Sequence, residues 1–161
     1  MSNEVIRYGI IGCGGIAHTH AESLMQIKGA KLIGVSGCSA QEPLGFAQKY
    51  GIKSFDSTEL LLKSQEIDAV TICTPSGFHA AIAINAAENK KHAIIEKPLS
   101  LTAKSAKQVV EAFKRNKVTG SVISQLRFSE EIRKAKKLIA DKKLGDIIMT
   151  NLTMKYFRSQ E

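Results

Sequence analysis

A glycine-rich turn near the start of this chain restricts the possible fold more than any other feature of the sequence. Residues 5–11 form a short β-rich run that stops at Gly12, and the apolar residues of segment 16–27 repeat at helical spacing. The turn between them reads G-x-G-x-x-A, with Gly12, Gly14 and Ala17. A strand, a tight glycine turn and a helix in this order predict the phosphate-binding unit of a Rossmann-type domain.

Each residue type in this turn suits the binding of a dinucleotide. Gly12 permits the sharp turn, Gly14 lets the backbone approach a pyrophosphate, and Ala17 is small enough for close helix–strand contact. Gly15 and Ile16 begin the helix, whose N-terminal amides favour a bound phosphate. We therefore predict that these residues bind a dinucleotide.

Strand-like and helix-like segments alternate from this turn as far as residue 124. Further strands are expected at residues 31–35, 52–55, 69–73, 92–95 and 119–124, and helices at 43–50, 58–64 (capped by Ser57), 78–89 and 100–116. The strands are mostly continuous apolar runs, as expected when helices cover both faces of a sheet. The pattern predicts an α/β fold with a doubly wound, mostly parallel sheet.

After residue 124 the pattern changes. Residues 129–143 read as a basic helix with an apolar stripe at Ile132, Ala135, Leu138 and Ile139, and residues 146–158 alternate like a half-covered antiparallel strand. A domain rarely ends on an unpaired long strand, because its free edge invites association. We expect a dinucleotide-binding domain at 1–124, and at 125–161 a linker helix and the first strand of a truncated α+β domain. An exposed strand of this kind would pair between chains.

Composition excludes several classes of protein. The chain has 161 residues, of which 43% are hydrophobic and 24% charged, a balance typical of globular proteins. No apolar run is long enough for a membrane span, and the N-terminus does not resemble a signal peptide. The cysteines Cys13, Cys38 and Cys73 form no CxxC pair, so we expect no metal site and a reducing, cytoplasmic location.

The net charge of +8 is unevenly distributed. Residues 1–90 carry 7 Lys/Arg against 8 Asp/Glu, whereas residues 91–161 carry 16 against 7. The basic helix at 133–143 leaves nucleic-acid binding as an alternative, but no aromatic side chains interleave with its lysines. We favour a solvated charged face and expect no nucleic-acid partner.

The residues after the second strand bear on the form of the cofactor. Rossmann domains that bind NAD usually have an acidic residue about twenty positions after the glycine turn. In this chain that place is occupied by Ser36, Gly37 and Cys38, which are not acidic. The missing carboxylate favours NADP slightly over NAD. No Arg or Lys stands there to attract a 2′-phosphate, and Lys53 is a remote candidate, so NAD remains an alternative.

Two further segments follow strands, at the sheet edge where open α/β sheets bind ligands. They are Thr74-Pro-Ser-Gly-Phe-His79 and Glu96-Lys-Pro98. Taken alone, His79 reads as a polar residue at a helix start, and the Glu–Lys pair as an ordinary surface pair. In combination with the glycine turn, their order and separation are much more specific.

The three segments together resemble the glucose–fructose oxidoreductase/inositol dehydrogenase (Gfo/Idh/MocA) family. The matching stretches are residues 9–17 with His20, residues 74–79 with Ala86-Ala87, and Ile95-Glu-Lys-Pro-Leu99. Residues 125–128 and 143–147 resemble the passage into the family's second domain, so the resemblance covers essentially the whole chain.

The resemblance implies an NAD(P)-dependent oxidoreductase that transfers hydride between nicotinamide and a sugar, cyclitol or related polyol. It places Lys97 beside the substrate hydroxyl as the catalytic residue that assists proton transfer. Glu96 orients nearby groups, Pro98 is commonly cis, and three residues line the cleft near the nicotinamide ribose: Thr74, Pro75 and His79. Gln125 is a weaker candidate for the same region.

The resemblance also implies that essential parts lie outside these 161 residues. In the family, further catalytic residues, most substrate contacts and the homo-oligomer interface belong to the second domain. We therefore expect this chain alone to bind cofactor with little turnover. A cofactor-binding or sensor module without catalysis is the alternative; we favour a fragment, because Arg158-Ser-Gln-Glu161 is no natural ending.

Overall fold

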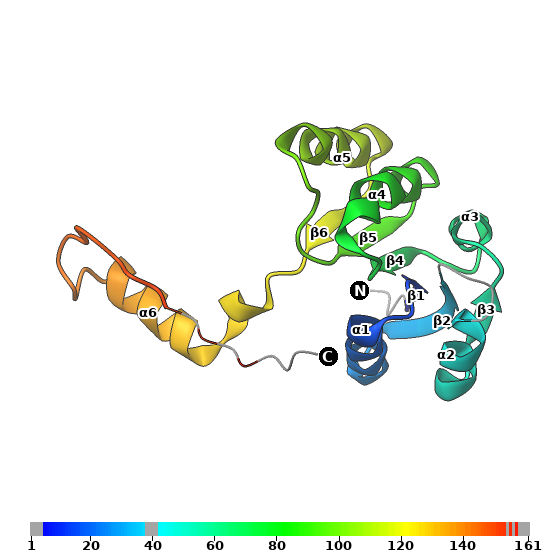
Figure 1. Cartoon of the computed structure of the whole chain (residues 1–161), viewed down its shortest axis with the longest axis horizontal. Coiled ribbons are helices and arrows are strands. Elements are labelled where there is room, and N and C mark those ends of the chain that lie inside the picture. Colours follow the sequence, from blue (N-terminus) through cyan, green and yellow to red (C-terminus); the bar gives the residue numbers. More distant parts are fainter. Residues whose placement is uncertain (1–4, 38–41, 154, 156, 158–161) are drawn as a thin grey trace. The chain divides into compact units, whose positions relative to one another are not determined.

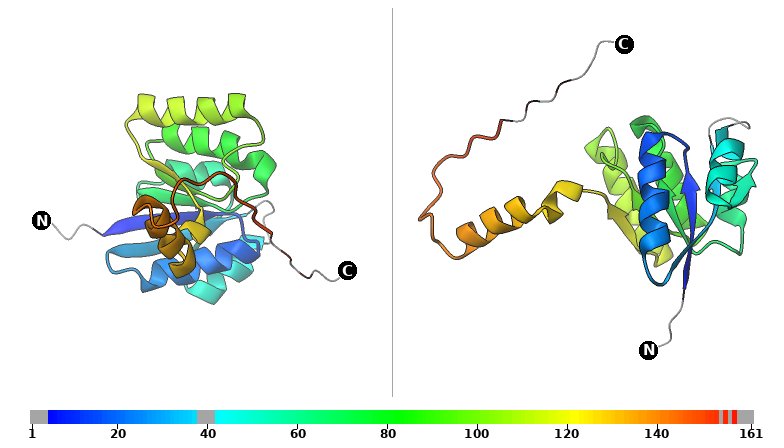
Figure 2. Two further views of the ribbon diagram at one scale, coloured as in Figure 1. Left: turned by 90° about the vertical axis from the view of Figure 1, so that its left-hand side faces the viewer. Right: turned by 90° about the horizontal axis from the view of Figure 1, so that it is seen from below.

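The computed structural model describes residues 5–37, 42–153, 155 and 157. The chain divides into two compact units, Met1–Ile123 and Ser124–Glu161. Figure 2 shows the ribbon from two further directions.

The first unit is built on a six-stranded sheet in the order β3-β2-β1-β4-β5-β6 (Figure 1). Every neighbouring pair in this sheet is parallel. The strands are β1 (Ile6–Ile11), β2 (Ala30–Ser36), β3 (Lys53–Phe55), β4 (Ala69–Ile72), β5 (His92–Ile95) and β6 (Gly120–Val122). The doubly wound parallel sheet predicted from the alternating pattern is therefore confirmed.

In the described residues of this unit, five helices and one 3₁₀ turn connect the strands. They are α1 (Gly15–Gln26), α2 (Glu42–Tyr50), α3 (Thr58–Lys63), η1 (Ser76–Phe78), α4 (His79–Glu88) and α5 (Ala103–Asn116). In Figure 1, α1 and α2 lie below the sheet and α4 lies above it. As predicted, α3 is capped by Ser57, whose side chain accepts a hydrogen bond from the Leu60 amide.

Apolar residues form one core on each face of the sheet. Ile10 of β1 packs with Ala17, Ala21 and Leu24 of α1 and with Phe46 of α2. Next along the strand, Ile11 faces the other core, which β4, α3, α4 and α5 complete. This alternation follows from the two-residue period of a strand, and it fixes both faces of β1.

The strand order reverses between β1 and β4, which are neighbours although two strands separate them in the sequence. Because all strands are parallel, the segments that follow them emerge at one edge of the sheet. Ligands of doubly wound folds bind at this reversal, outside the carboxyl ends of the strands. The fold therefore directs attention to the segments that follow β1, β4 and β5.

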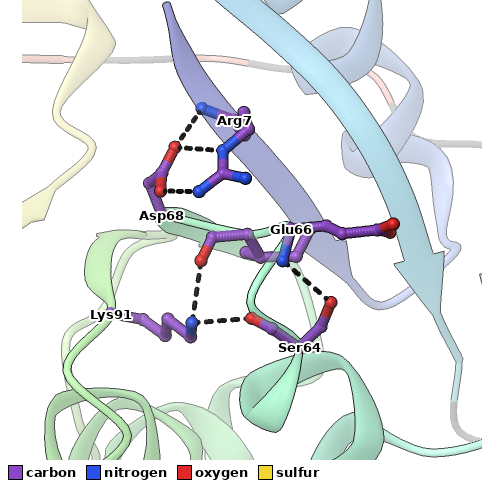
Figure 3. A network of polar contacts seen from close by, with 6 residues as sticks. Arg7, Ser64, Glu66, Asp68 and Lys91 are labelled. Atoms are coloured by element: carbon purple, nitrogen blue, oxygen red, sulfur yellow. Dashed lines mark hydrogen bonds and ion pairs between the residues drawn. The ribbon is translucent and has the colours of Figure 1, made fainter.

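The opposite edge, where the strands begin, is held by a polar network (Figure 3). The Asp68 carboxylate accepts hydrogen bonds from the Arg7 backbone amide at 2.9 Å and from its Nε at 2.8 Å. The Lys91 Nζ is buried and donates to the carbonyl oxygens of Ser64 and Ile67, both at 2.8 Å. Desolvation by burial lowers the pKa of Lys91.

The second unit contains η2 (Gln125–Phe128) and α6 (Glu130–Ala140). The prediction of a strand at 146–158 was wrong for the described residues of that range, since none of them is in a strand. An isolated strand leaves its backbone donors and acceptors without ladder partners. In the described part of this unit, no second strand supplies them.

The apolar stripe of α6 is also more exposed than expected. Ile132, Leu138 and Ile139 are 47%, 40% and 51% exposed. A stripe of this kind is buried only against another element, and beside α6 the described part of the unit holds just the short η2 and irregular chain. None of the helices in the described residues is both long and apolar enough to cross a membrane.

Candidate functional site

Hydrogen bonds beyond the strand ends hold the three chemistry-bearing segments in line. The Gly12 amide donates to the Ser36 carbonyl at 2.8 Å, and the Cys73 amide donates to the Ile11 carbonyl at 2.8 Å. The Glu96 amide continues the series by donating to the Ile72 carbonyl at 3.0 Å. The glycine turn and the segments after β4 and β5 therefore lie beside one another at the strand-order reversal.

Gly12 occupies a position that only glycine fits. Its φ is +101°, in the region that side chains disfavour. A Cβ built there would lie 2.8 Å from both the carbonyl carbon and the carbonyl oxygen of Cys73. The turn thus passes directly against the end of β4, as the sequence motif predicts.

Gly14 and Gly15 are glycines for a different reason. Gly14 has an ordinary extended conformation as the N-cap of α1, and a Cβ on either residue would meet no atom within 4 Å. No side chain caps the helix, and its first turn contains no acidic residue. The N-terminus of α1 thus presents unfilled space beside amides that favour an anion. Ile16 follows, 40% exposed.

The segment after β4 contains an unsatisfied polar atom. The Thr74 hydroxyl oxygen is buried, and none of the described residues forms a hydrogen bond with it. Buried polar groups normally have a partner, so this atom indicates a ligand group or a water at that place. Pro75 is exposed and precedes η1 as its N-cap.

The resemblance implies that His79 lines the cleft near the nicotinamide ribose, but its side chain is buried. It is 1% exposed, and each of its ring nitrogens is 2.7 Å from a main-chain carbonyl oxygen. Nδ1 contacts the oxygen of Pro98, and Nε2 contacts the oxygen of Thr74. Both nitrogens are thus used within the protein.

Lys97 is exposed at the end of β5, and it is followed by Pro98 across a cis peptide bond. The neighbouring Glu96 is buried, and its carboxylate accepts a hydrogen bond from the Lys97 amide at 3.1 Å. The other carboxylate oxygen lies 3.1 Å from Nε2 of His20, a residue of α1. Glu96 therefore links the helix of the glycine turn to the backbone of Lys97.

His20 is the site residue to which sequence reasoning assigned no role. The sequence feature that could have indicated a role is its position in α1, since it lies one turn after Ile16 on the helix that the glycine turn begins. The pairing itself spans 76 positions in the sequence. No local pattern predicts a contact of that separation.

The end of β2 gives mixed support to the residues expected near the cofactor's ribose. Ser36 is fully buried, and its hydroxyl lies 3.2 Å from that of Thr58. Gly37 is half-buried, and Cys38 lies outside the described residues. Lys53, the remote candidate for a 2′-phosphate, forms an ion pair with Glu66.

Two other predictions concern Gln125 and metal binding. Gln125 is exposed in the second unit, and its role stays a prediction. Among the described residues, no three His, Cys, Asp or Glu side chains come together as a metal site.

Comparison with known proteins gives a family match over most of the chain. A family model described as an oxidoreductase family with an NAD-binding Rossmann fold matches residues 6–124. This range contains the glycine turn, the Thr74–His79 segment and Glu96-Lys97-Pro98. The match thus covers the whole sheet and each segment placed at the reversal.

Three similar proteins illustrate the relationship. Glucose-6-phosphate 3-dehydrogenase of Bacillus subtilis is 31% identical over 92% of this chain and 42% of its own length. Inositol 2-dehydrogenase of Rubrobacter xylanophilus is 34% identical over 68% of this chain and 32% of its own length. The crystal structure of the WlbA dehydrogenase from Bordetella pertussis in complex with NADH and UDP-GlcNAcA has a TM-score of 0.86 at 27% identity, covering 90% of this chain and 44% of that one. This chain thus spans less than half of each relative.

Proposed function

This chain belongs to the Gfo/Idh/MocA oxidoreductase family, and from that premise we propose that it is the cofactor-binding part of a dehydrogenase acting on a sugar, cyclitol or related polyol. The observation that carries the proposal is the unfilled space at Gly14 and Gly15, on an uncapped helix start beside the ends of β4 and β5. The similar proteins include dehydrogenases of glucose 6-phosphate and of inositol.

The residues present fit a nicotinamide dinucleotide. The pyrophosphate would lie against the N-terminus of α1, where the absence of a Cβ at Gly14 and Gly15 permits close approach. A ribose hydroxyl of the cofactor would satisfy the Thr74 Oγ1, which has no partner in the part of the chain that the structure describes. When bound, the nicotinamide ring supplies the hydride acceptor or donor.

Lys97 is the catalytic residue of this proposal. Its ammonium group would donate a hydrogen bond to the substrate oxygen, and its Nζ would hold or release the proton that moves when an alcohol and a carbonyl interconvert. Glu96 fixes the Lys97 backbone through its amide. Because the Glu96 side chain is buried and paired with His20, we assign it a positioning role rather than direct contact with substrate.

The form of the cofactor follows from the end of β2. Neither Ser36 nor Gly37 repels a 2′-phosphate, and Lys53 is already paired with Glu66. We propose that the domain accepts both NAD and NADP, with a slight preference for NADP. The substitution Gly37→Asp should lower NADPH affinity at least tenfold relative to NADH, because like charges repel.

The second unit is proposed to be the beginning of the substrate domain. Since the relatives are more than twice as long as the matched region, most substrate contacts would come from residues outside this chain. We therefore expect NADH binding without appreciable turnover of inositol or glucose 6-phosphate by the 161-residue chain.

Calorimetric titration of this chain with NADH, NADPH and ADP-ribose tests the proposal. Saturable one-site binding of all three ligands is expected, since each contains the pyrophosphate that α1 would bind. The absence of binding at millimolar ligand by a chain that unfolds cooperatively would refute the proposed function.

A further inference from the structure

The buried ring of His79 joins two loops at the reacting end of the site. His79 is the first residue of α4, yet its ring contacts no side chain oxygen; both of its polar contacts are to main-chain carbonyls. One carbonyl belongs to Thr74, directly after β4, and the other to Pro98, directly after Lys97. The ring is 1% exposed, so water does not replace either contact.

The geometry determines how many protons the ring must donate to hold both loops. A carbonyl oxygen can only accept a hydrogen bond, and a neutral imidazole has one N–H. Each ring nitrogen is 2.7 Å from its carbonyl oxygen, within normal hydrogen-bond range. Both contacts are therefore hydrogen bonds only when both nitrogens carry a proton and donate it.

We propose that His79 is a positioning residue, which by donating from both ring nitrogens fixes the Thr74 and Pro98 carbonyls and so sets the place of Lys97 against the nicotinamide half of the cofactor. This inference rests on the proposed function. It differs from the role expected from the sequence, because the ring acts through two loops and does not itself touch the cofactor.

The fold separates this role from binding of the rest of the cofactor. In a doubly wound sheet each half of a dinucleotide occupies one side of the reversal. The β1–α1 turn and the end of β2 lie on the adenosine side, whereas Thr74 and Pro98 follow β4 and β5 on the other side. Loss of the His79 contacts should therefore weaken recognition of nicotinamide and its ribose and leave recognition of ADP intact.

The experiment compares NADH with ADP, which lacks both nicotinamide and the ribose that carries it, in calorimetric titrations of the unaltered chain and of His79→Gln. A glutamine side chain presents one NH₂ group and cannot donate in the two directions that the ring serves. We expect NADH affinity to fall at least tenfold and ADP affinity to change less than twofold. His92→Gln is the matched control, because His92 starts β5 at the opposite edge, and it should change neither affinity.

A second measurement tests the contacts without any variant. The ¹⁵N chemical shifts of the His79 ring in the unaltered chain, at the pH of the titrations, should show both nitrogens protonated. A ring with one bare nitrogen would overturn the proposal even if His79→Gln failed to fold.

The remaining outcomes are distinguishable. Equal loss of NADH and ADP affinity in a folded variant, or no loss of either, would overturn the role of His79 and leave the proposed function standing. Failure of the unaltered chain to bind either ligand would overturn the proposed function, and the role of His79 with it.

Discussion

Gly12 and Gly14 are two positions apart, but glycine is required at each for a separate physical reason. Gly12 is required by the protein itself, because its φ is positive and a Cβ would collide with the Cys73 backbone. Gly14 is conformationally ordinary, and space is open around it. The requirement for glycine there comes from the ligand that the site is proposed to hold.

A pair of alanine substitutions separates these two requirements. Gly14→Ala should lower the free energy of unfolding by no more than about 1 kcal/mol, since alanine is a poorer N-cap than glycine, but should lower NADH affinity at least tenfold. Gly12→Ala should destabilise the chain by more than about 2 kcal/mol, through left-handed strain and the backbone clash. Urea unfolding and calorimetry measure the two effects. Equal stability losses in both variants would contradict the distinction.

Cys73 provides a prediction about pH. Burial raises the pKa of its thiol from 9.0 to about 12 in the folded chain. Above pH 9 the unfolded thiol loses its proton while the folded one keeps it, so the free energy of unfolding falls as pH rises. Relative to Cys73→Ala, the unaltered chain should lose about 1.4 kcal/mol between pH 8 and pH 10. A pH-independent difference between the two chains in urea unfolding would contradict this expectation.

Local signals predicted some residues of the site and not their connections. The glycine turn was predicted from a contiguous motif, and the family resemblance implied the cis bond before Pro98, whereas the role of Lys97 stays a prediction. The contact of His20 with Glu96 and the two carbonyl contacts of His79 join separate segments, and they depend on how the sheet aligns its strand ends. Sequence patterns carry no record of that alignment.

At the scale of elements, the start of α5 shows how a capping residue determines a boundary. The sequence predicted a helix from residue 100, whereas α5 begins at Ala103. Thr102 has an extended backbone, and its side chain accepts a hydrogen bond from the Ser105 amide at 3.2 Å. Several hydroxyl residues stand in this stretch, so the sequence alone did not identify which of them is the cap.

The cap of α5 is a testable contribution to stability. Thr102→Ala should reduce the free energy of unfolding by about 1 kcal/mol, the usual effect of losing such a cap. NADH affinity should not change, since α5 starts beyond the segments proposed to bind cofactor. Thr102→Ser, which keeps the hydroxyl, is the control and should retain most of the stability. An unchanged urea midpoint in Thr102→Ala would show that the cap contributes nothing.

Sheet elements were predictable where burial was strong. The strand β4 is buried at all four positions, and its apolar run was recognised from the sequence. The expected strand at 146–158 had the right alternation, but alternation describes only which side chains would share a face. Whether a strand forms also depends on a neighbour for its backbone, and the described part of the second unit offers none.

At the scale of the whole molecule, cofactor binding should stabilise the first unit. A ligand that binds only the folded state at 100 times its dissociation constant adds about 2.7 kcal/mol to the free energy of unfolding. We expect the melting temperature to rise with NADH concentration, and to rise less in Gly14→Ala at the same concentrations. A melting temperature independent of NADH would be inconsistent with binding to the folded chain.

The edge of the sheet where the strands end and the edge where they begin have different functions. Gly12, Thr74 and Lys97 follow strands at one edge, while Arg7, Asp68 and Lys91 hold the strand beginnings at the other. Positions at the first edge, Gly12 excepted, can thereby change without loosening the network that ties the strands together. A laboratory selection for a changed NAD/NADP preference should consequently accumulate substitutions after β1 and β2, and leave the Arg7–Asp68–Lys91 end of the sheet unaltered.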